Sequence, residues 1–359
     1  MKQTCLICKR SALNKNLFCQ ETYCPAEMSP TILGFGEWLG DIEIVKPIKV
    51  TRSAVLYEAT HHKEKVLLKV AHPGEPHKIR LQREALFLAD RMAAGDLPEE
   101  LPHLRPAYVG TTVAEHPYGK TMLGGHLLYF YLIEFFEGEP LSDILKEKPL
   151  PWLNHVGWIT ISLSTAINYL NVMRHLHLGV NPDVILVRFD DKPWVPRILL
   201  FDLGLISPLN DVPKYWYPDF VHPAYLAPEL SRQTGLTASY RSDVYSTGLV
   251  LYEMLIGEPA FPHDLHGDAR VRSAVVTLPR ADMYRRQETE EVARIASQAT
   301  DVEPMIRHET VAAVGNALIE QFGHVPDPEP SRWPSKNTII VIIFALLAIA
   351  LIVAVAILA

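Results

Sequence analysis

The sequence has few cysteines and little charge. Only four cysteines occur in 359 residues, which argues against a disulfide-stapled secreted scaffold and favours a reducing compartment. Charged residues make up 21% and hydrophobic residues 48%, a balance that excludes a disordered chain. The net charge of -7 provides no positive field that could hold a polyanion. Nucleic acid is therefore not an expected partner, and a folded core is expected.

Long apolar stretches are absent from the start of the chain and appear only at its other end. Residues 1–15 lack the apolar segment of a signal peptide. By contrast, residues 339–359 carry no polar side chain, and about 21 residues at roughly 1.5 Å each span a hydrocarbon core of about 30 Å. A buried core helix is the alternative. With Arg332 and Lys336 on its flank, this run predicts a single-pass transmembrane helix over 338–359 and a cytoplasmic body.

Proline is concentrated just before the apolar run. The segment 324–337 contains four prolines and little that could form a core. At about 3.1 Å per residue, such a stiff chain could hold the body up to about 40 Å from a bilayer. We interpret this segment as a juxtamembrane linker.

The four cysteines all lie within residues 1–28. Cys5 and Cys8 have the two-residue gap of a metal-binding turn, and Cys19 with Cys24 could complete a tetrahedral thiolate site. The segment resembles a short zinc ribbon, in which a closed four-sulfur site would be structural because it leaves no position for water. Free thiols are the alternative, although a peptide this short could hardly fold without a cross-link.

Between Trp38 and Gly323 no tandem repeat is visible, and strands give way to helices. Residues 46–72 contain two β-branched runs separated by the polar segment 61–65, which predicts a hairpin. Residues 77–95 have apolar side chains at helical spacing and a glycine, Gly95, placed to end a helix. Residues 242–257 predict a core helix with Ser242 as its cap and Gly257 as its stop.

Five short motifs follow one another along this central part. They are VLLKV with Lys69, a helix with Glu84 fifteen residues later, YLIEFFEGEPLSDIL over 131–145, RILLFDLGL over 197–205, and AYLAPEL over 224–230. In this order they resemble the protein kinase family. The resemblance implies an α+β, two-lobed fold, with a β-rich N-lobe over about 38–133 and a helical C-lobe over about 137–323.

The resemblance also implies roles for individual residues. Lys69 and Glu84 would form the ion pair that aligns a phosphate-binding lysine, and Asp202 would hold magnesium. Backbone groups of Glu134 and Phe136 would face an adenine. The implied structural residues are His177, Leu203, Gly204, Glu229, Asp243 and Arg307, of which Glu229 and Arg307 would pair. ATP with magnesium would be the implied cofactor.

The catalytic loop departs from the family pattern. Gly179 stands where the family has the aspartate that accepts the substrate proton, and Val184 replaces the asparagine that holds a second magnesium. Glycine offers no side chain, and valine offers no oxygen to a hard cation. Asp183 is a weak candidate for a replacement base, because it would need a re-routed loop to reach the same point.

The phosphate-binding loop departs as well. Its three glycine positions are Lys49, Thr51 and Ala54, whose side chains restrict the approach of backbone amides to phosphate. Lys69, Glu84 and Asp202 could still bind a nucleotide with one metal ion, or form a structural ion-pair network.

The departures in these two loops predict a catalytically impaired pseudokinase that presents surfaces to protein partners. The apolar run over 338–359 predicts that it is anchored in a membrane. The alternative is an active, divergent serine/threonine kinase that transfers the γ-phosphate of ATP to protein by positioning and one metal.

Overall fold

The computed structural model describes the body of the chain and a short ladder near its start. The described residues are 3–4, 11–12, 32–123, 125–189, 195–203, 205–212, 218–231, 238–261, 268–277 and 290–323. The four cysteines, Gly204, the linker 324–337 and the predicted transmembrane helix 338–359 lie outside these residues. In the described part of the chain, no helix has the length and apolar character needed to span a bilayer.

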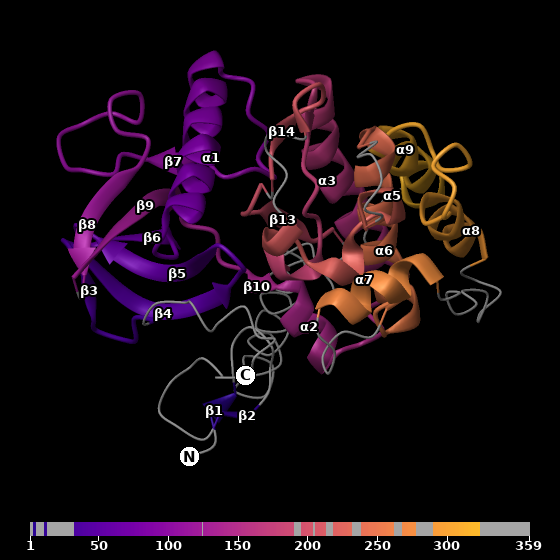
Figure 1. The fold of residues 1–359 in the computed structure, drawn as a ribbon, viewed down its shortest axis with the longest axis horizontal. Coiled ribbons are helices and arrows are strands. Elements are labelled where there is room, and N and C mark those ends of the chain that lie inside the picture. Colours follow the sequence, from indigo (N-terminus) through magenta and orange to yellow (C-terminus); the bar gives the residue numbers. More distant parts are fainter. Residues whose placement is uncertain are drawn as a thin grey trace, which may run out of the picture. The chain divides into compact units, whose positions relative to one another are not determined.

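The first lobe is a curled antiparallel sheet with one long helix beside it (Figure 1). The strand order is β3-β4-β5-β6-β9-β7, and β8 pairs with β9. The strands are β3 (Trp38–Leu39), β4 (Ile42–Val50), β5 (Ala54–His61), β6 (Glu64–Ala71), β7 (Leu104–Arg105), β8 (Gly119–Leu123) and β9 (His126–Glu134). The predicted hairpin is confirmed, since β5 and β6 pair in continuous register from Ala54–Ala71 to His61–Glu64.

Helix α1 (Glu75–Ala94) places one face against this sheet, burying Leu81, Ala85 and Leu88. It ends where predicted, because Gly95 takes φ 74°, and its amide donates back to the carbonyls of Arg91 and Met92. The left-handed conformation costs glycine nothing and most other residues about 1 kcal/mol or more.

The second lobe is helical (Figure 1). Its helices are α2 (Leu141–Glu147), α3 (Leu153–Val172), α5 (Pro228–Ser231), α6 (Tyr240–Ile256), α7 (Asp268–Thr277), α8 (Glu290–Ala299) and α9 (Val311–Phe322). Short strands and 3-10 turns connect them: β10 (Glu139–Pro140), β11 (His175–Leu176), η2 (Pro182–Val184), β12 (Ile185–Arg188), β13 (Arg197–Leu200), β14 (Ser207–Pro208), η3 (Pro218–Phe220) and η4 (Pro223–Tyr225). Strand β12 pairs with both β10 and β13, so one small sheet carries the segments on either side of η2.

Helix α6 is the buried centre of this lobe and has a different cap from the predicted one. Ser239 is the N-cap and accepts from the amide of Arg241, whereas Ser242 is the third helical residue and its hydroxyl accepts from the amide of Ser239. The two serines form a reciprocal capping box, so the prediction of Ser242 as cap is wrong by three residues. Gly257 ends the helix with φ 83°, as predicted.

Two apolar clusters hold the body together. One lies within the N-lobe, with Leu39, Ile44, Leu68 and Leu132 among its members. The other is continuous from α1 and β6 through the loops between the lobes to α6 and α9. Because this second core crosses from one lobe to the other, the polar residues between the lobes have fixed positions.

The ladder near the start of the chain pairs β1 (Gln3–Thr4) with β2 (Ser11–Ala12) in antiparallel register. The six residues that this pairing closes into a loop include Cys5 and Cys8 in the sequence.

Candidate functional site between the two lobes

Lys69, Glu84 and Asp202 come together in a buried network. Strand β6 carries Lys69, whose Nζ donates to Glu84 Oε2 at 2.6 Å and lies 3.4 Å from Asp202 Oδ1. Glu84 Oε1 accepts from the amide of Leu203 at 2.8 Å. Each of the three charged side chains is at most 3% exposed. Three residues from distant segments of the chain, each singled out from the sequence, therefore lie together.

Arg80 joins this network and was not predicted. It lies one helical turn before Glu84 on α1, so both side chains project from the same face. Its guanidinium donates to Asp202 Oδ1 at 2.6 Å and also to the hydroxyl of Ser53, on the loop before β5. One signal was available in the sequence, because an arginine four residues before Glu84 must share its buried side.

The backbone around Asp202 is fixed by His177. Its Nε2 and the carbonyl oxygen of Asp202 are 2.8 Å apart, and its Nδ1 accepts from the amide of Gly179 at 3.1 Å. Burial lowers the pKa of His177 to about 4, against the opposing charge of Asp202. Near neutral pH this imidazole is uncharged and links the carbonyl of Asp202 to the amide of Gly179 through hydrogen bonds.

The segment after His177 is held from below by Asp243 on α6. Its carboxylate accepts from the amides of His177 at 3.0 Å and Leu178 at 2.9 Å, and from the side-chain amide of Asn171 at 3.2 Å. Leu178 takes φ 57°, an unfavourable conformation for a leucine. Burial raises the pKa of Asp243 to about 6, although these hydrogen bonds favour its charged form.

Gly179 follows directly and lines the cavity between the lobes, but it offers no side chain there. The same cavity is lined by Asn181, Asp183, Val184, Asp202, Arg80 and His222. A proton acceptor at the predicted base position is thus missing among the described residues, and only Asp183 could replace it.

Asp183 is instead engaged with Lys49. The Nζ of Lys49 lies 2.5 Å from Asp183 Oδ1 and 3.3 Å from Asp143 Oδ1, and it donates to the hydroxyl of Ser142 at 2.6 Å. Burial opposes the charged form of Asp183, but the charge of Lys49 outweighs it and holds the pKa of Asp183 well below its usual range. A carboxylate with so low a pKa is a poor base at neutral pH.

Lys49 also links the phosphate-loop position to the C-lobe. It stands at the first glycine position of the phosphate loop, yet its side chain, 2% exposed, reaches across the cleft to α2 and η2. Burial lowers the pKa of Lys49, but the charges of Asp183 and Asp143 outweigh this and raise it, so the ammonium group stays charged. The end of β4, directly before the loop to β5, is therefore held against α2 and η2.

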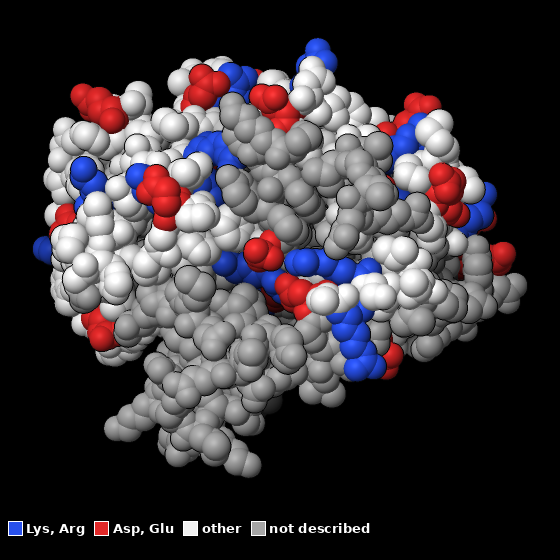
Figure 2. Space-filling view, in the orientation of Figure 1, with Lys and Arg blue, Asp and Glu red and all other residues white. Residues whose placement is uncertain are grey.

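A second tie joins the tip of that loop to the C-lobe. Arg52 donates from both terminal nitrogens to the carboxylate of Asp268 on α7, at 2.6 and 2.9 Å. Arg272, one turn along α7, lies 3.5 Å from the same carboxylate. Figure 2 shows basic and acidic side chains side by side across the middle of this face, where the two lobes meet.

These contacts decide whether the cleft fits magnesium. The oxygen donors that line the cavity are chiefly the carboxylates of Asp202 and Asp183, and both are bonded to cationic side chains. Val184 supplies no oxygen at the second metal position. Magnesium in kinase-type sites is usually held by one or two carboxylates together with waters and nucleotide phosphates. Because both carboxylates here are engaged by cations, the residues present do not fit this ion, and they favour the structural ion-pair network among the two alternatives.

The comparisons with known proteins agree with the fold. The family model described as protein kinase domain matches residues 124–313. A serine/threonine-protein kinase of Drosophila melanogaster is 29% identical over 132 residues, and one of Drosophila simulans is 33% identical over the same length. The chain belongs to the protein kinase family. Each match covers 37% of this chain but only 17% of the relative.

Solved structures extend the likeness to most of the chain. The crystal structure of the Mycobacterium tuberculosis PknI kinase domain, as a double mutant, matches with a TM-score of 0.57 at 20% identity. That match covers 82% of this chain and all of the other. It supports the two-lobed kinase fold.

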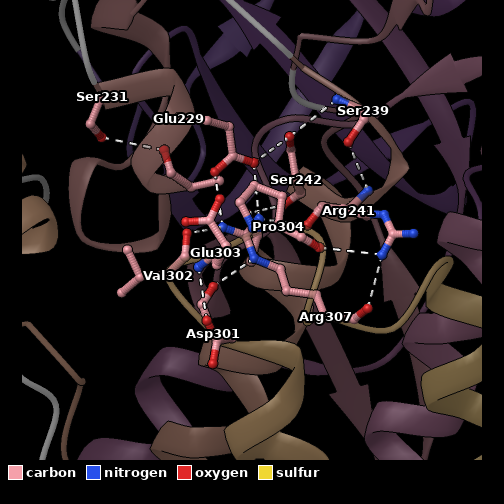
Figure 3. A network of polar contacts seen from close by, with 12 residues as sticks. Glu229, Ser231, Ser239, Arg241, Ser242, Asp301, Val302, Glu303, Pro304 and Arg307 are labelled. Carbon is pink, nitrogen blue, oxygen red and sulfur yellow. Dashed lines mark hydrogen bonds and ion pairs between the residues drawn. The ribbon is translucent and has the colours of Figure 1, made fainter.

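The ion pair that the resemblance implied for Glu229 and Arg307 lies in the C-lobe (Figure 3). Arg307 donates from both terminal nitrogens to the carboxylate of Glu229, each at 2.9 Å, and its Nε donates to the carbonyl of Asp301 at 2.7 Å. Ser242 Oγ donates to the same carboxylate at 2.8 Å. The predicted pairing of Glu229 with Arg307 is confirmed.

The remaining predicted positions are spread over both lobes. Glu134 ends β9, and Phe136 lies in the segment that leads from that strand into the C-lobe. Leu203, implied as a structural residue, and Leu88 on α1 are fully buried. His222 caps η4 through its Nδ1. Members of this family use ATP and magnesium, and the cleft residues described above are where this chain departs from them.

Proposed function

We propose that this chain is a pseudokinase, a kinase fold that acts as a binding and signalling module for protein partners without transferring phosphate. One observation carries the proposal. Asp202, the carboxylate that would hold magnesium, is bonded to Arg80 and Lys69 in a buried network, while Gly179 leaves the base position empty. Positioning and charge stabilisation are most of phosphoryl-transfer catalysis, and both are diverted here into contacts within the protein.

The direct test is phosphate incorporation by the purified full chain with ATP and either magnesium or manganese. The expected result is no transfer above that of the Lys69→Ala variant. Robust transfer that Lys69→Ala abolishes would overturn the proposal. A thermal shift with ATP, with and without magnesium, gives a second measurement, since any ligand that binds only the native state raises its stability. Magnesium is expected to add nothing to the shift.

An active, divergent serine/threonine kinase is the second candidate. It is favoured by the intact pair of Lys69 and Glu84 at 2.6 Å and by the naming of the relatives as serine/threonine kinases. The Gly179→Asp variant separates the two. An active enzyme that already has a route for the proton should gain little, whereas a pseudokinase should also need Val184→Asn and the removal of Arg80 before it transfers phosphate.

We propose membrane anchoring through residues 338–359, with the kinase domain in the cytoplasm. The support is the run of about 21 apolar residues and the basic residues Arg332 and Lys336 before it. Membrane fractionation of the full chain, followed by carbonate extraction, tests the anchor. Release of the chain into the soluble fraction would contradict it, and protease protection of the kinase domain would contradict the orientation.

We further propose that Cys5, Cys8, Cys19 and Cys24 bind one structural zinc ion. The spacing of the cysteines supports this, and so does the β1–β2 pairing that brackets the first two. Zinc content measured by mass spectrometry in the chain and in a variant with all four cysteines changed to serine tests the site. An unchanged zinc content would contradict it.

A further inference from the structure

Two tight turns lie next to each other at one end of the N-lobe sheet. Leu39 pairs with Ile42, so Gly40 and Asp41 form the two-residue turn between β3 and β4. His61 pairs with Glu64, so His62 and Lys63 form the two-residue turn between β5 and β6. Because Ile42 also pairs with His61, Asp41 and His62 are neighbours across β4 and β5. The register therefore fixes three potential metal ligands close together.

The turn geometry aims both imidazoles at the same point. Successive side chains of a strand point to opposite faces, which would separate His61 from His62. His62 instead takes φ 49° and Lys63 takes φ 70°, both in the left-handed region. The rings of His61 and His62 meet edge to face with centroids 4.4 Å apart. This turn thus brings adjacent histidines to one side of the sheet.

Both imidazoles lie next to the same carboxylate oxygen of Asp41. Nε2 of His61 is 3.2 Å and Nε2 of His62 is 3.1 Å from Asp41 Oδ2. The three potential ligand atoms lie within 4.8 Å of one another. Ligands bound at about 2.0–2.1 Å in a tetrahedral shell stand about 3.3 Å apart, so the two nitrogen-to-oxygen distances are already close to those of a metal shell.

We propose that Asp41, His61 and His62 form a binding site for a divalent transition-metal ion of the zinc class. Two imidazoles and one carboxylate are ligands that zinc prefers, and three protein ligands leave a fourth position for water or for a donor from another molecule. His61 is 11% exposed, whereas His62 and Asp41 are about half exposed, so the site is open to the ion. The site lies on the sheet, apart from the cleft, and does not depend on the proposed function.

The chemistry of the three groups fits this role. An aspartate carboxylate is ordinarily ionised near neutral pH, and a neutral imidazole can bind a metal through a nitrogen that carries no proton, so a bound ion would replace the present contacts between the rings and the carboxylate. A bound ion would join the two turns and stabilise the native state by mass action.

The experiment compares zinc stoichiometry in the full chain and in the double variant His61→Gln/His62→Gln, after stripping with a chelator and titration with zinc. The expected result is one zinc ion fewer per chain in the double variant. The single variant Asp41→Asn should bind this ion at least tenfold more weakly. His126→Gln is the matched control, because His126 is an exposed histidine at the β8–β9 turn of the same sheet.

The four cysteines are unchanged in every variant, so any zinc that they bind is the same in each and cancels in the comparison. Equal thermal midpoints of the metal-free proteins show that the variants fold. Equal zinc stoichiometry in the chain and the double variant would overturn the proposal, as would an equal loss in His126→Gln.

Discussion

Two buried charged networks of this kinase fold have opposite relations to the family chemistry. Below the cleft, Arg307 and Glu229 form a bidentate pair in the geometry that the motifs predict. In the cleft, the predicted residues are also in place, but Arg80 and Lys49 add two cations that satisfy the carboxylates within the protein. The first network keeps the structural ion pair that the family resemblance implies. In the second, the carboxylates that catalysis would use are already paired with cations.

Matching sequence motifs therefore cannot by itself establish that a kinase fold is active. In both networks each charge has its partner, so neither network leaves a buried charge uncompensated. Only the cleft network uses for this purpose the carboxylate that catalysis would need free. A kinase fold can therefore keep Lys69, Glu84 and Asp202 in sequence while their geometry serves stability.

The largest expected effect comes from breaking the network below the cleft. Arg307→Leu leaves the carboxylate of Glu229 buried with only Ser242 as a side-chain donor. Removing one partner of a buried ion pair costs about 3–5 kcal/mol, so we expect a loss of that size in the free energy of unfolding, measured by urea denaturation. The exposed Arg294→Leu is the control, since its pair with Glu291 lies on the surface of α8 and should cost less than about 1 kcal/mol. Similar losses in both variants would contradict the contrast.

The second prediction concerns how the free energy of unfolding depends on pH through groups in the two regions. His72, whose Nε2 lies 2.9 Å from the carbonyl oxygen of Thr51, and His177 are both buried, and burial lowers the pKa of each to about 4. Between pH 6.5 and 4 the unfolded chain binds protons that the folded chain does not. The free energy of unfolding should therefore fall as pH falls, by up to about 1.4 kcal/mol per pH unit for each histidine.

Asp243, below the cleft, has the opposite sign. Its pKa is raised to about 6, so the stability that its protonation provides is present below pH 3.8 and is lost as pH rises through 6. Urea midpoints measured from pH 4 to 7 check both effects. His72→Gln should flatten the slope, and Asp243→Asn should steepen it. A slope that neither variant changes would contradict this assignment.

The order of the motifs predicted the kinase fold through their resemblance to the family, and the same resemblance implied that Lys69, Glu84 and Asp202 would lie together. It could not predict Arg80 as a partner of Asp202, which is 122 residues away in the chain, because that contact depends on how far a side chain reaches across the cleft. The pairing of Lys49 with Asp183 was missed for the same reason. The cap of α6 was misplaced because two serines three residues apart share one capping box. Local spacing identifies single residues, whereas partners depend on tertiary packing.

The third prediction concerns the role of Arg80 in the cleft network. Arg80→Met removes one cation but leaves Lys69 3.4 Å from Asp202. The stability loss should be about 1–3 kcal/mol, smaller than for Arg307→Leu, because Asp202 keeps a cationic partner. With its Oδ1 relieved of the guanidinium, Asp202 becomes available to a metal ion, so ATP with magnesium should now give a larger thermal shift than ATP with EDTA.

The control for the third prediction is Arg80→Lys, which keeps the charge and should leave the magnesium effect absent. Equal thermal shifts with magnesium and with EDTA in Arg80→Met would contradict the view that Arg80 blocks metal binding.

The smallest effect is expected where the loop between β4 and β5 meets α7. Arg52 and Asp268 form a bidentate pair, but their side chains are 15% and 30% exposed. Partly exposed pairs contribute about 1 kcal/mol or less, and salt screens them. A double-mutant cycle with Arg52→Gln and Asp268→Asn should give a coupling of that size that declines in high salt. A coupling of several kcal/mol, or one unaffected by salt, would show that the tip of this loop belongs with the buried networks. The closure of the cleft would then depend on the loop tip as much as on Arg80 and Lys49.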